Sequence, residues 1–264
     1  MTITGALHIH SAHSYDAKLS IKAIREIAER RGISFLCFTE HSDELTKEAA
    51  EAFVRECEAA SDDTFICIPG FEVNYNGTHV LMIGCRTFVS QHATSTDLPL
   101  WKAGAALAIH AHPHRDRYYE DATVQSVVDG IEIWNAQYDG KRVPRNGAGR
   151  MFKKLSRKLP LHAFAGWDFH RASHEGGPLI AIHTENISEE SILSALAAGN
   201  YTMSSALVSV GSDGKVLRGS PFMITLTSAF STTFIALGKG VNAMLAGMGL
   251  RAPKPLAAAV RKRI

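Results

Sequence analysis

Residues 3–16 read ITGALHIHSAHSYD, and this stretch carries the main indication of the fold. Its first half is apolar enough for a buried strand, and its end holds His8 and His10. Side chains two residues apart in a strand share a face, so both imidazoles would leave the strand end together. The same arrangement recurs at 163–170, where the apolar run AFAGWDFH ends in Asp168 and His170.

Three further apolar runs, 35–41, 64–72 and 106–112, end in His41, Glu72 and His112. We expect two more strands at 79–85 and 130–135, and a tight turn at Asn76-Gly77 that joins 64–72 to 79–85. Helical patterns at 21–31, 46–60, 118–128, 146–158 and 188–199 separate the runs. This alternation predicts a parallel α/β barrel, in which the C-terminal ends of the strands meet at one rim.

The composition excludes several classes of protein. With 264 residues, 45% apolar and 20% charged, the chain is neither disordered nor collagen-like nor a coiled coil. A net charge of +2 conceals an asymmetry, because residues 199–264 hold eight Lys and Arg but one acidic residue. The rest of the chain is net acidic and holds the clustered histidines, which suits cation binding better than wrapping of a polyanion.

The chain has no Pro- or Ser-rich linker, so we expect one barrel-like domain over 1–205. Residues 206–264 would form a C-terminal extension, a strand and a helix packed on the barrel and not an independent domain. The uncharged segment 219–238 is long enough to span a bilayer, but it holds seven Ser and Thr and has Pro221 near its start. We interpret it as a strand and a buried helix, with no integral membrane segment.

The four cysteines form no C-x-x-C pair and no short metal-binding spacing. Three of them, Cys37, Cys67 and Cys85, lie in apolar runs, which predicts buried thiols in a reducing compartment. The first ten residues have neither the basic region nor the apolar core of a signal peptide. The predicted location is cytoplasmic.

The strand ends together offer more His, Asp and Glu than one tetrahedral ion can use. Mixed imidazole and carboxylate ligands suit Zn, Mn or Fe, so the sequence predicts two or three divalent metal ions at the rim. His110 shares a face with His112 but lies deeper in its strand, which favours a packed or outer role. Glu40 should point away from His41 and support a loop.

In order along the chain, the motifs resemble those of the PHP (polymerase and histidinol phosphatase) family over residues 5–205. The resemblance implies a distorted seven-stranded (β/α)7 barrel with a multinuclear metal site. It also implies nine metal ligands: His8, His10, Asp16, His41, Glu72, His79, His112, Asp168 and His170.

The family pattern divides these ligands among the ions. One ion would take His8, His10, Glu72 and Asp168, with Glu72 bridging to a second ion at His79 and His112. A third would take Asp16, His41 and His170. The chain departs from the family at Ala6 and Ala17, neither of which removes a ligand, and His13 is a reserve for Asp16.

The chemistry implied is phosphoester hydrolysis. Three divalent ions among three carboxylates leave a positive field that attracts phosphate and lowers the pKa of a bound water. No catalytic side chain is predicted beyond the metal-bound hydroxide, because no Ser, Cys or Asp nucleophile lies in a suitable context. Arg115, Arg171 and His114 follow ligand motifs closely enough to contact a substrate phosphate.

The substrate favoured by this reasoning is a phosphomonoester of a small molecule or nucleotide. A phosphodiesterase or 5′-exonuclease on short nucleic acids is an alternative, supported by the basic stretch 142–158. A C–N or C–O hydrolase of amidohydrolase type and a non-catalytic, metal-stabilised regulatory module are the other two. Trp134 and Asn135 could contact a substrate base or sugar, or pack.

Overall fold

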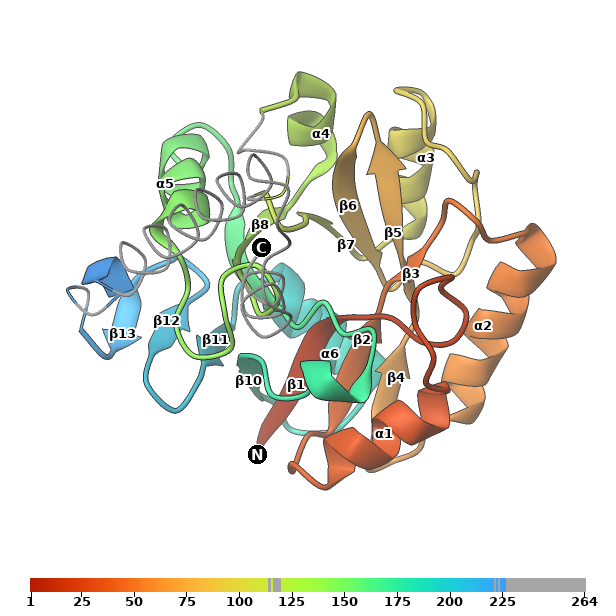
Figure 1. Ribbon diagram of the computed structural model, residues 1–264, viewed down its shortest axis with the longest axis horizontal. Helices are drawn as coiled ribbons and strands as arrows, with labels where there is room; N and C mark the ends of the chain where they lie inside the picture. Colours follow the sequence, from red (N-terminus) through yellow and green to blue (C-terminus); the bar gives the residue numbers. More distant parts are fainter. Residues whose placement is uncertain (114, 116–119, 221, 223, 227–264) are drawn as a thin grey trace, which may run out of the picture.

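The computed structural model describes residues 1–113, 115, 120–220, 222 and 224–226. Its helices are α1 (Ile21–Glu29), α2 (Lys47–Ala59), α3 (Asp97–Gly104), α4 (Ala122–Val127), α5 (Asn146–Leu155) and α6 (Glu189–Ala197), with a 3-10 turn at Ala172–His174. In Figure 1, β1, β2, β7 and β8 lie toward the middle of the molecule, α1 to α5 lie around the periphery, and β12 and β13 lie at the left edge.

The strands form two sheets. Sheet A has the order β13 (Val216–Arg218), β12 (Ser209–Gly211), β11 (Tyr201–Ser204), β10 (Leu179–His183), β1 (Thr2–Ile9), β2 (Phe35–Phe38) and β4 (Ile66–Ile68). Sheet B has the order β3 (Glu40–His41), β5 (Gly70–Tyr75), β6 (Thr78–Ile83), β7 (Leu107–His110), β8 (Gly130–Asn135) and β9 (His162–Gly166). The α/β class predicted from the sequence is confirmed.

The two sheets are joined at both sides. On one side only Thr39 separates β2 from β3, and only Pro69 separates β4 from β5. On the other side the residues after β9 pair with β1: Trp167 N–H donates to Leu7 O at 2.9 Å, and His10 N–H donates to Phe169 O at 2.9 Å. The ends of β1, β3, β5 and β9 are therefore held close together.

Strand direction differs in part from the expectation of a parallel sheet. β1–β2, β2–β4, β3–β5, β7–β8 and β8–β9 are parallel, but β6 runs antiparallel to both its neighbours, and β10 runs antiparallel to β1. The Asn76-Gly77 turn explains the first case, because both residues have positive φ, at 51° and 84°, and a two-residue turn can only reverse the chain. The sequence prediction missed α3, β10 and β11, and within 206–264 it expected one strand where the structure has β12 and β13.

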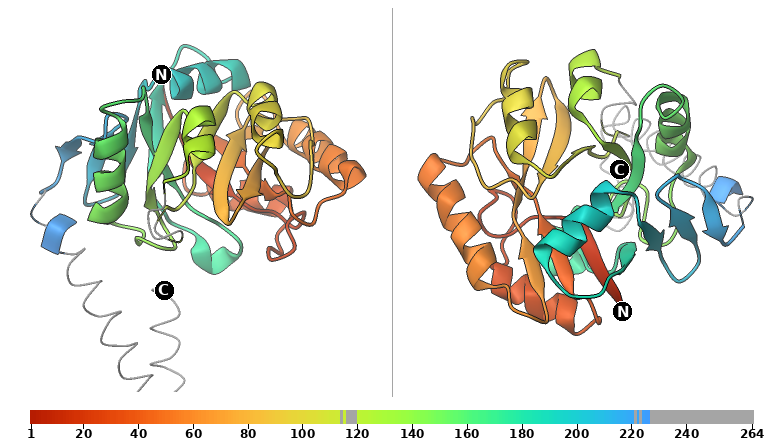
Figure 2. Two further views of the ribbon diagram at one scale, coloured as in Figure 1. Left: turned by 90° about the horizontal axis from the view of Figure 1, so that it is seen from above. Right: turned by 180° about the vertical axis from the view of Figure 1, so that it is seen from behind.

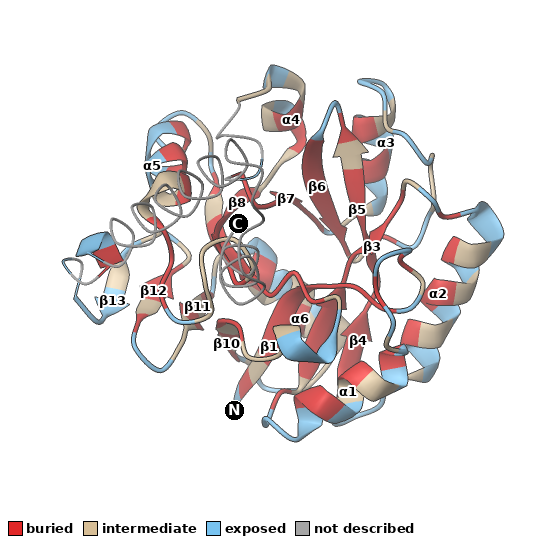
Figure 3. Ribbon diagram, in the orientation of Figure 1, coloured by how far each residue is buried: buried red, intermediate tan, exposed pale blue. Residues whose placement is uncertain are grey.

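The helices cover the sheets with apolar faces that the sequence spacing predicts. Ser20, Thr46 and Ser188 accept hydrogen bonds from first-turn N–H groups and start α1, α2 and α6. One core cluster packs α1 to α4 on Ala6, Ile9 and other strand residues, and a second gathers Leu7 with α5 and α6. Figure 3 shows the buried strand residues at the centre and exposed residues on the outer helix faces.

The described beginning of the predicted extension forms β12 and β13, which continue sheet A beyond β11. Figures 1 and 2 show these strands at the opposite end of the molecule from α2. The helix predicted within 219–238 falls almost entirely outside the described residues. Among the residues that are described, no helix combines the length and the apolarity needed to cross a membrane.

Candidate metal centre

All nine candidate ligands lie in one connected cluster. They come from β1 and the loop after it, from β3, β5 and β6, and from the residues after β7 and β9. Glu72 lies at the centre and is almost fully buried. Its Oε1 is 2.8 Å from His112 Nε2 and also contacts His79 Nδ1.

The second oxygen of Glu72 faces three more imidazoles. Oε2 is 3.1 Å from His41 Nδ1, 3.2 Å from His10 Nε2 and 3.4 Å from His8 Nε2. Asp16 lies at the outer side, 39% exposed, with its oxygens 3.1 Å from His170 Nε2 and 3.5 Å from His41 Nε2.

Four overlapping groups of three residues bring their ligand atoms within 4.8 Å of one another. They are His8–His10–Glu72, His8–His112–Asp168, His10–His41–His170 and His41–Glu72–His79. Each group is close enough for its three atoms to share one cation, and the second and third have no residue in common. The chain therefore has room for more than one divalent ion.

The pattern of unsatisfied atoms fits metal ions. His8 Nε2, His10 Nε2, His112 Nδ1 and Glu72 Oε2 are buried, and none has a hydrogen-bond partner among the described residues. A buried polar atom without a partner costs about 1–3 kcal/mol, so four in one cluster need an explanation. Imidazole nitrogens and carboxylate oxygens are the donors that Zn, Mn and Fe bind.

The electrostatics of the cluster favour ionised carboxylates. Burial alone would raise the pKa of the Glu72 carboxyl, but the surrounding histidines, His79 and His8 foremost, hold it well below its ordinary value. The pKa of Asp168 is lowered in the same way, against burial, by His8, His112 and His170. Ionised carboxylates are the form that binds a cation.

The pKa values of two neighbouring histidines, His10 and His8, are shifted in opposite directions. Burial, followed by the neighbouring His41, lowers the pKa of His10 to about 3, so this imidazole is neutral. For His8 the effect of burial is outweighed by Glu132, Asp168 and Glu72, which raise its pKa well above the ordinary value. A cation bound here would replace the proton as the balancing positive charge.

Backbone strain is concentrated at this cluster. Of the four described non-glycine residues with positive φ, three are candidate ligands: His8 at 64°, His112 at 25° and Asp168 at 53°. Such conformations cost on the order of 1–3 kcal/mol each and persist only where the surroundings fix them. They gather at functional sites more often than elsewhere.

The backbone conformation of His8 corrects the prediction that His8 and His10 share one face of a regular strand. Strand β1 has an irregularity between Leu7 and Ile9, so Ala6 and Ile9 contact the same core cluster although they are three residues apart. His8 is the extra residue of this bulge, which re-aims its side chain. His8 and His10 do come together, with ring centroids 5.2 Å apart, but not through regular alternation.

Two buried residues of β8 belong to the site. Glu132 was not singled out from the sequence, and Asn135 was considered there only as a possible contact to a substrate base or sugar. Glu132 is 1% exposed, lies with Oε1 3.0 Å from His8 Nδ1, and accepts the His112 N–H at 2.7 Å. Asn135 Nδ2 donates to Glu132 at 3.0 Å and to Asp168 Oδ2 at 3.3 Å. The sequence did contain a signal for Glu132, because this glutamate lies between two isoleucines of an apolar strand. A carboxylate cannot be buried there without a partner, so its presence indicates one.

Glu40 supports the loop after β1, as the sequence suggests. It accepts hydrogen bonds from Ser11 N–H at 2.8 Å and from Ser14 Oγ at 2.5 Å. Ser14 Oγ in turn lies 3.2 Å from His10 Nδ1 and accepts the His41 N–H at 3.0 Å.

The predicted substrate contacts are placed only in part. Arg115 lies at the cluster, with Nη1 2.7 Å from His79 Nε2. Arg171 is exposed and donates to His174 Nε2 at 2.8 Å, and His114 lies outside the described residues. The reserve ligand His13 points away from the cluster and contacts Glu56 at 2.8 Å. Trp134 is buried and donates to Gly140 O, so it packs.

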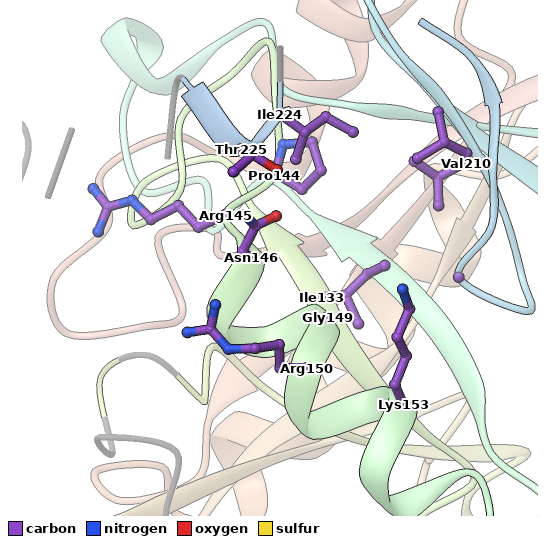
Figure 4. Close-up of a pocket in the computed structure, with 12 residues that line it drawn as sticks. Ile133, Pro144, Arg145, Asn146, Gly149, Arg150, Lys153, Val210, Ile224 and Thr225 are labelled. Atoms are coloured by element: carbon purple, nitrogen blue, oxygen red, sulfur yellow. The ribbon is translucent and has the colours of Figure 1, made fainter. Parts of the chain in front are cut away.

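A separate cavity of about 310 Å³ lies between α5, β12, β13 and residues 224–225 (Figure 4). Arg145, Arg150 and Lys153 of the basic stretch line it, together with apolar residues such as Ile133 and Val210. None of the nine candidate ligands lines this cavity. It is a feature distinct from the metal centre.

Taken together, the two joined sheets and the cluster of six histidines and three carboxylates define an α/β protein with several overlapping groups of residues that could hold a metal ion. Residues 6–127 match the family model of the PHP domain, in agreement with the resemblance that the sequence motifs indicate.

Solved structures similar to this fold include PsfC from Pseudomonas syringae, at 17% identity and a TM-score of 0.54, covering 73% of this chain and 88% of that one. A Bifidobacterium adolescentis protein titled a "putative metal-dependent phosphoesterase" has 13% identity, a TM-score of 0.48 and coverage of 73% and 95%. An amidohydrolase from Chromobacterium violaceum has 18% identity, a TM-score of 0.45 and coverage of 72% and 96%. No curated protein matches the chain.

Proposed function

We propose that this protein is a metal-dependent hydrolase that cleaves a phosphomonoester of a small molecule or nucleotide. The observation that carries the proposal is the cluster around Glu72, where nine candidate ligands meet and four buried ligand atoms lack hydrogen-bond partners among the described residues. The PHP domain over 6–127 supports the same class. The proposed ligands are the nine residues named above, for two or three ions of Zn, Mn or Fe.

Bound ions would supply a water of lowered pKa as nucleophile and would hold the phosphate oxygens. The chain's own residues prepare that site. The Glu72 carboxylate stays ionised among the imidazoles, and the His10 ring stays neutral and able to bind a cation. Tyr15 stacks on His41 with ring centroids 5.1 Å apart and partly covers that side of the cluster.

Arg115 is the proposed phosphate-binding residue. Its guanidinium lies beside His79, one of the nine ligands, and can offer two parallel N–H groups to phosphate oxygens. Arg171 and His114 complete the proposed substrate contacts. A phosphate bound between the ions and Arg115 would have its charge neutralised from two sides.

The wider architecture belongs to the same proposal. Seven strand paths, with β2–β3 and β4–β5 each counted as one, would form the distorted barrel, closed where the residues after β9 pair with β1. Residues 1–205 would be this barrel, and 206–264 an extension that continues sheet A. Four unpaired, buried cysteines support a reducing and therefore cytoplasmic location.

The test is hydrolysis of an aryl phosphate by metal-loaded protein. His8→Ala and Asp168→Ala should lower the rate by at least 100-fold and reduce bound metal, while circular dichroism remains that of the folded protein. Full activity of either variant with unchanged metal content would show that the site is assigned wrongly. Glu51→Gln, on the exposed face of α2, is the matched control.

A substrate panel separates the monoesterase from the phosphodiesterase or 5′-exonuclease alternative. Nucleoside monophosphates, bisphosphates and short oligonucleotides should be compared under the same metal conditions. We expect phosphate release from the small substrates. Product from oligonucleotides alone would reject the phosphomonoester assignment, and the cavity lined by Arg145, Arg150 and Lys153 would then be the first surface to mutate.

A further inference from the structure

Two buried glutamates lie behind the candidate ligands, and each contacts a different part of the cluster. Glu132 contacts residues of the group His8–His112–Asp168, whereas Glu40 acts through Ser14 on the group His10–His41–His170. These two groups have no residue in common. Both glutamates have 1% or less of their surface exposed.

Glu132 and Asn135 reach all three members of the first group. Glu132 Oε1 is 3.0 Å from His8 Nδ1, and Glu132 Oε2 accepts the His112 N–H at 2.7 Å. Asn135 Nδ2 bridges from Glu132 Oε2 to Asp168 Oδ2, at 3.0 and 3.3 Å. These three ligands are also the three with positive φ, so one pair of side chains holds every strained residue of the centre.

The chemistry of these contacts requires a carboxylate at position 132. A carboxylate accepts on both oxygens, and here it receives hydrogen bonds from His112 N–H and Asn135 on one and lies opposite the His8 ring on the other. With its proton held on Nδ1, His8 has Nε2 free to bind a metal, and Nε2 points toward Glu72 and Asp168. A glutamine would place an NH2 group against one of these donors.

Glu40 and Ser14 make a similar arrangement for two members of the second group, His10 and His41. The Ser14 hydroxyl donates to Glu40, which leaves its two lone pairs for His10 Nδ1 and the His41 N–H. His10 is thereby oriented with Nε2 toward Glu72. A glutamine at position 40 could donate to Ser14 Oγ and give that oxygen three donors for two lone pairs.

We infer that Glu132 with Asn135, and Glu40 with Ser14, are two independent positioning units, each of which fixes the ligands of one metal position. The inference rests on the proposed metal centre but not on its phosphatase activity. Neither glutamate touches the proposed substrate. Each acts through a ligand by fixing its tautomer, its ring orientation or its backbone.

The experiment measures metal occupancy position by position, with Zn²⁺ as the probe. Equilibrium dialysis with elemental analysis gives the affinity of each variant, and anomalous diffraction at the zinc edge locates the ions in crystals. Glu132→Gln should weaken Zn²⁺ binding 10–100-fold at the position beside His8, His112 and Asp168, the range expected when the partner of a ligand is lost. The position beside His10, His41 and His170 should keep its occupancy.

Glu40→Gln should give the reverse result, so each variant is the control for the other. Asn135→Asp, which keeps the shape but turns a carboxylate toward Glu132 and Asp168, should reproduce Glu132→Gln. Ser14→Ala should reproduce Glu40→Gln. Glu51→Gln controls for the loss of one negative charge on the surface.

Equal loss at both positions in Glu132→Gln and in Glu40→Gln would overturn the inference, as would full occupancy in folded variants. If a glutamine variant fails to fold, Asn135→Asp and Ser14→Ala decide the question. Failure of the proposed function would look different. In that case the wild-type protein would bind Zn²⁺ at both positions and hydrolyse none of the phosphate esters.

Discussion

Gly166 shows how tightly the centre is packed at a single residue. A Cβ at this position would lie 1.9 Å from Glu132 Oε1 and 2.7 Å from His8 Cβ. Neither neighbour can move freely, because Glu132 is fixed by three contacts and His8 lies in a strained bulge. The glycine therefore permits a close approach and does not serve a turn.

We predict that Gly166→Ala lowers aryl phosphate hydrolysis by at least tenfold and destabilises the fold by about 1–3 kcal/mol, the usual cost of overpacking a core. Kinetic assays and urea denaturation measure the two effects. Gly149→Ala on α5 is the control, because nothing lies within 4 Å of the added methyl group. Wild-type activity in Gly166→Ala would show that the contact between Glu132 and His8 is dispensable.

Asp139, which is not itself a candidate ligand, gives a dependence on pH of its own. Its Oδ2 accepts the Asn135 N–H at 2.8 Å, while its Oδ1 is buried with no hydrogen-bond partner among the described residues. Burial raises the pKa of the carboxyl to about 7, although Asn135 and Arg145 oppose the shift. In the unfolded chain it would titrate near 3.8.

The unfolded state therefore loses this proton first, and the contribution of Asp139 to stability falls as the pH rises from about 4 to about 7. Asp139→Asn keeps the accepting oxygen and removes the ionisation. We expect its stability relative to wild type to be about 1–3 kcal/mol more favourable at pH 8 than at pH 5, from urea denaturation of metal-free protein. The same difference at both pH values would contradict the shift.

At the scale of elements, the strand ends could be predicted from sequence because each shows the same simple sign, an apolar run that stops at His, Asp or Glu. The elements that could not be predicted depend on long-range pairing. Strand β10 is specified by its antiparallel register with β1, in which Thr2 lies opposite His183. No local sequence pattern can predict pairing with a strand that lies so far away in the chain.

The same limit applies within the site. The pattern of residues indicated which side chains gather, but regular alternation would have turned His8 toward the face of Ala6. Only the bulge and the positive φ at His8 bring it beside Glu72, and that conformation depends on Glu132 from another strand. Glu132 itself was missed because a lone buried glutamate has no spacing to reveal it.

At the scale of the whole molecule, the centre joins both sheets, so bound metal should stabilise the entire fold. The ligands come from β1 in sheet A and from β3, β5 and β6 in sheet B, as well as from the segments after β7 and β9. A ligand that binds only the native state adds about 2.7 kcal/mol at a concentration 100 times its Kd.

We predict that removal of metal by a chelator lowers the Tm by about 5–10 °C, since about 2–4 °C per kcal/mol is expected for a chain of this size. Differential scanning calorimetry of loaded and chelated protein measures the shift, and added Zn²⁺ should reverse it. Chelation should lower the Tm of His8→Ala by less than that of the wild type, because only the position beside His10, His41 and His170 would still bind an ion. An equal drop in that variant would mean that the stabilising ion binds elsewhere.

The pairing of β1 with the residues after β9 has a consequence for synthesis on the ribosome. His8 and His10 are translated well before Asp168, His170 and the β10 partner of β1. At a translation rate of about 5–20 residues per second, on the order of ten seconds or more pass between synthesis of the two histidines and synthesis of these partners. Until then β1 lacks the residues that pair with it on that side, so we expect the metal centre to assemble only after β10 has been synthesised.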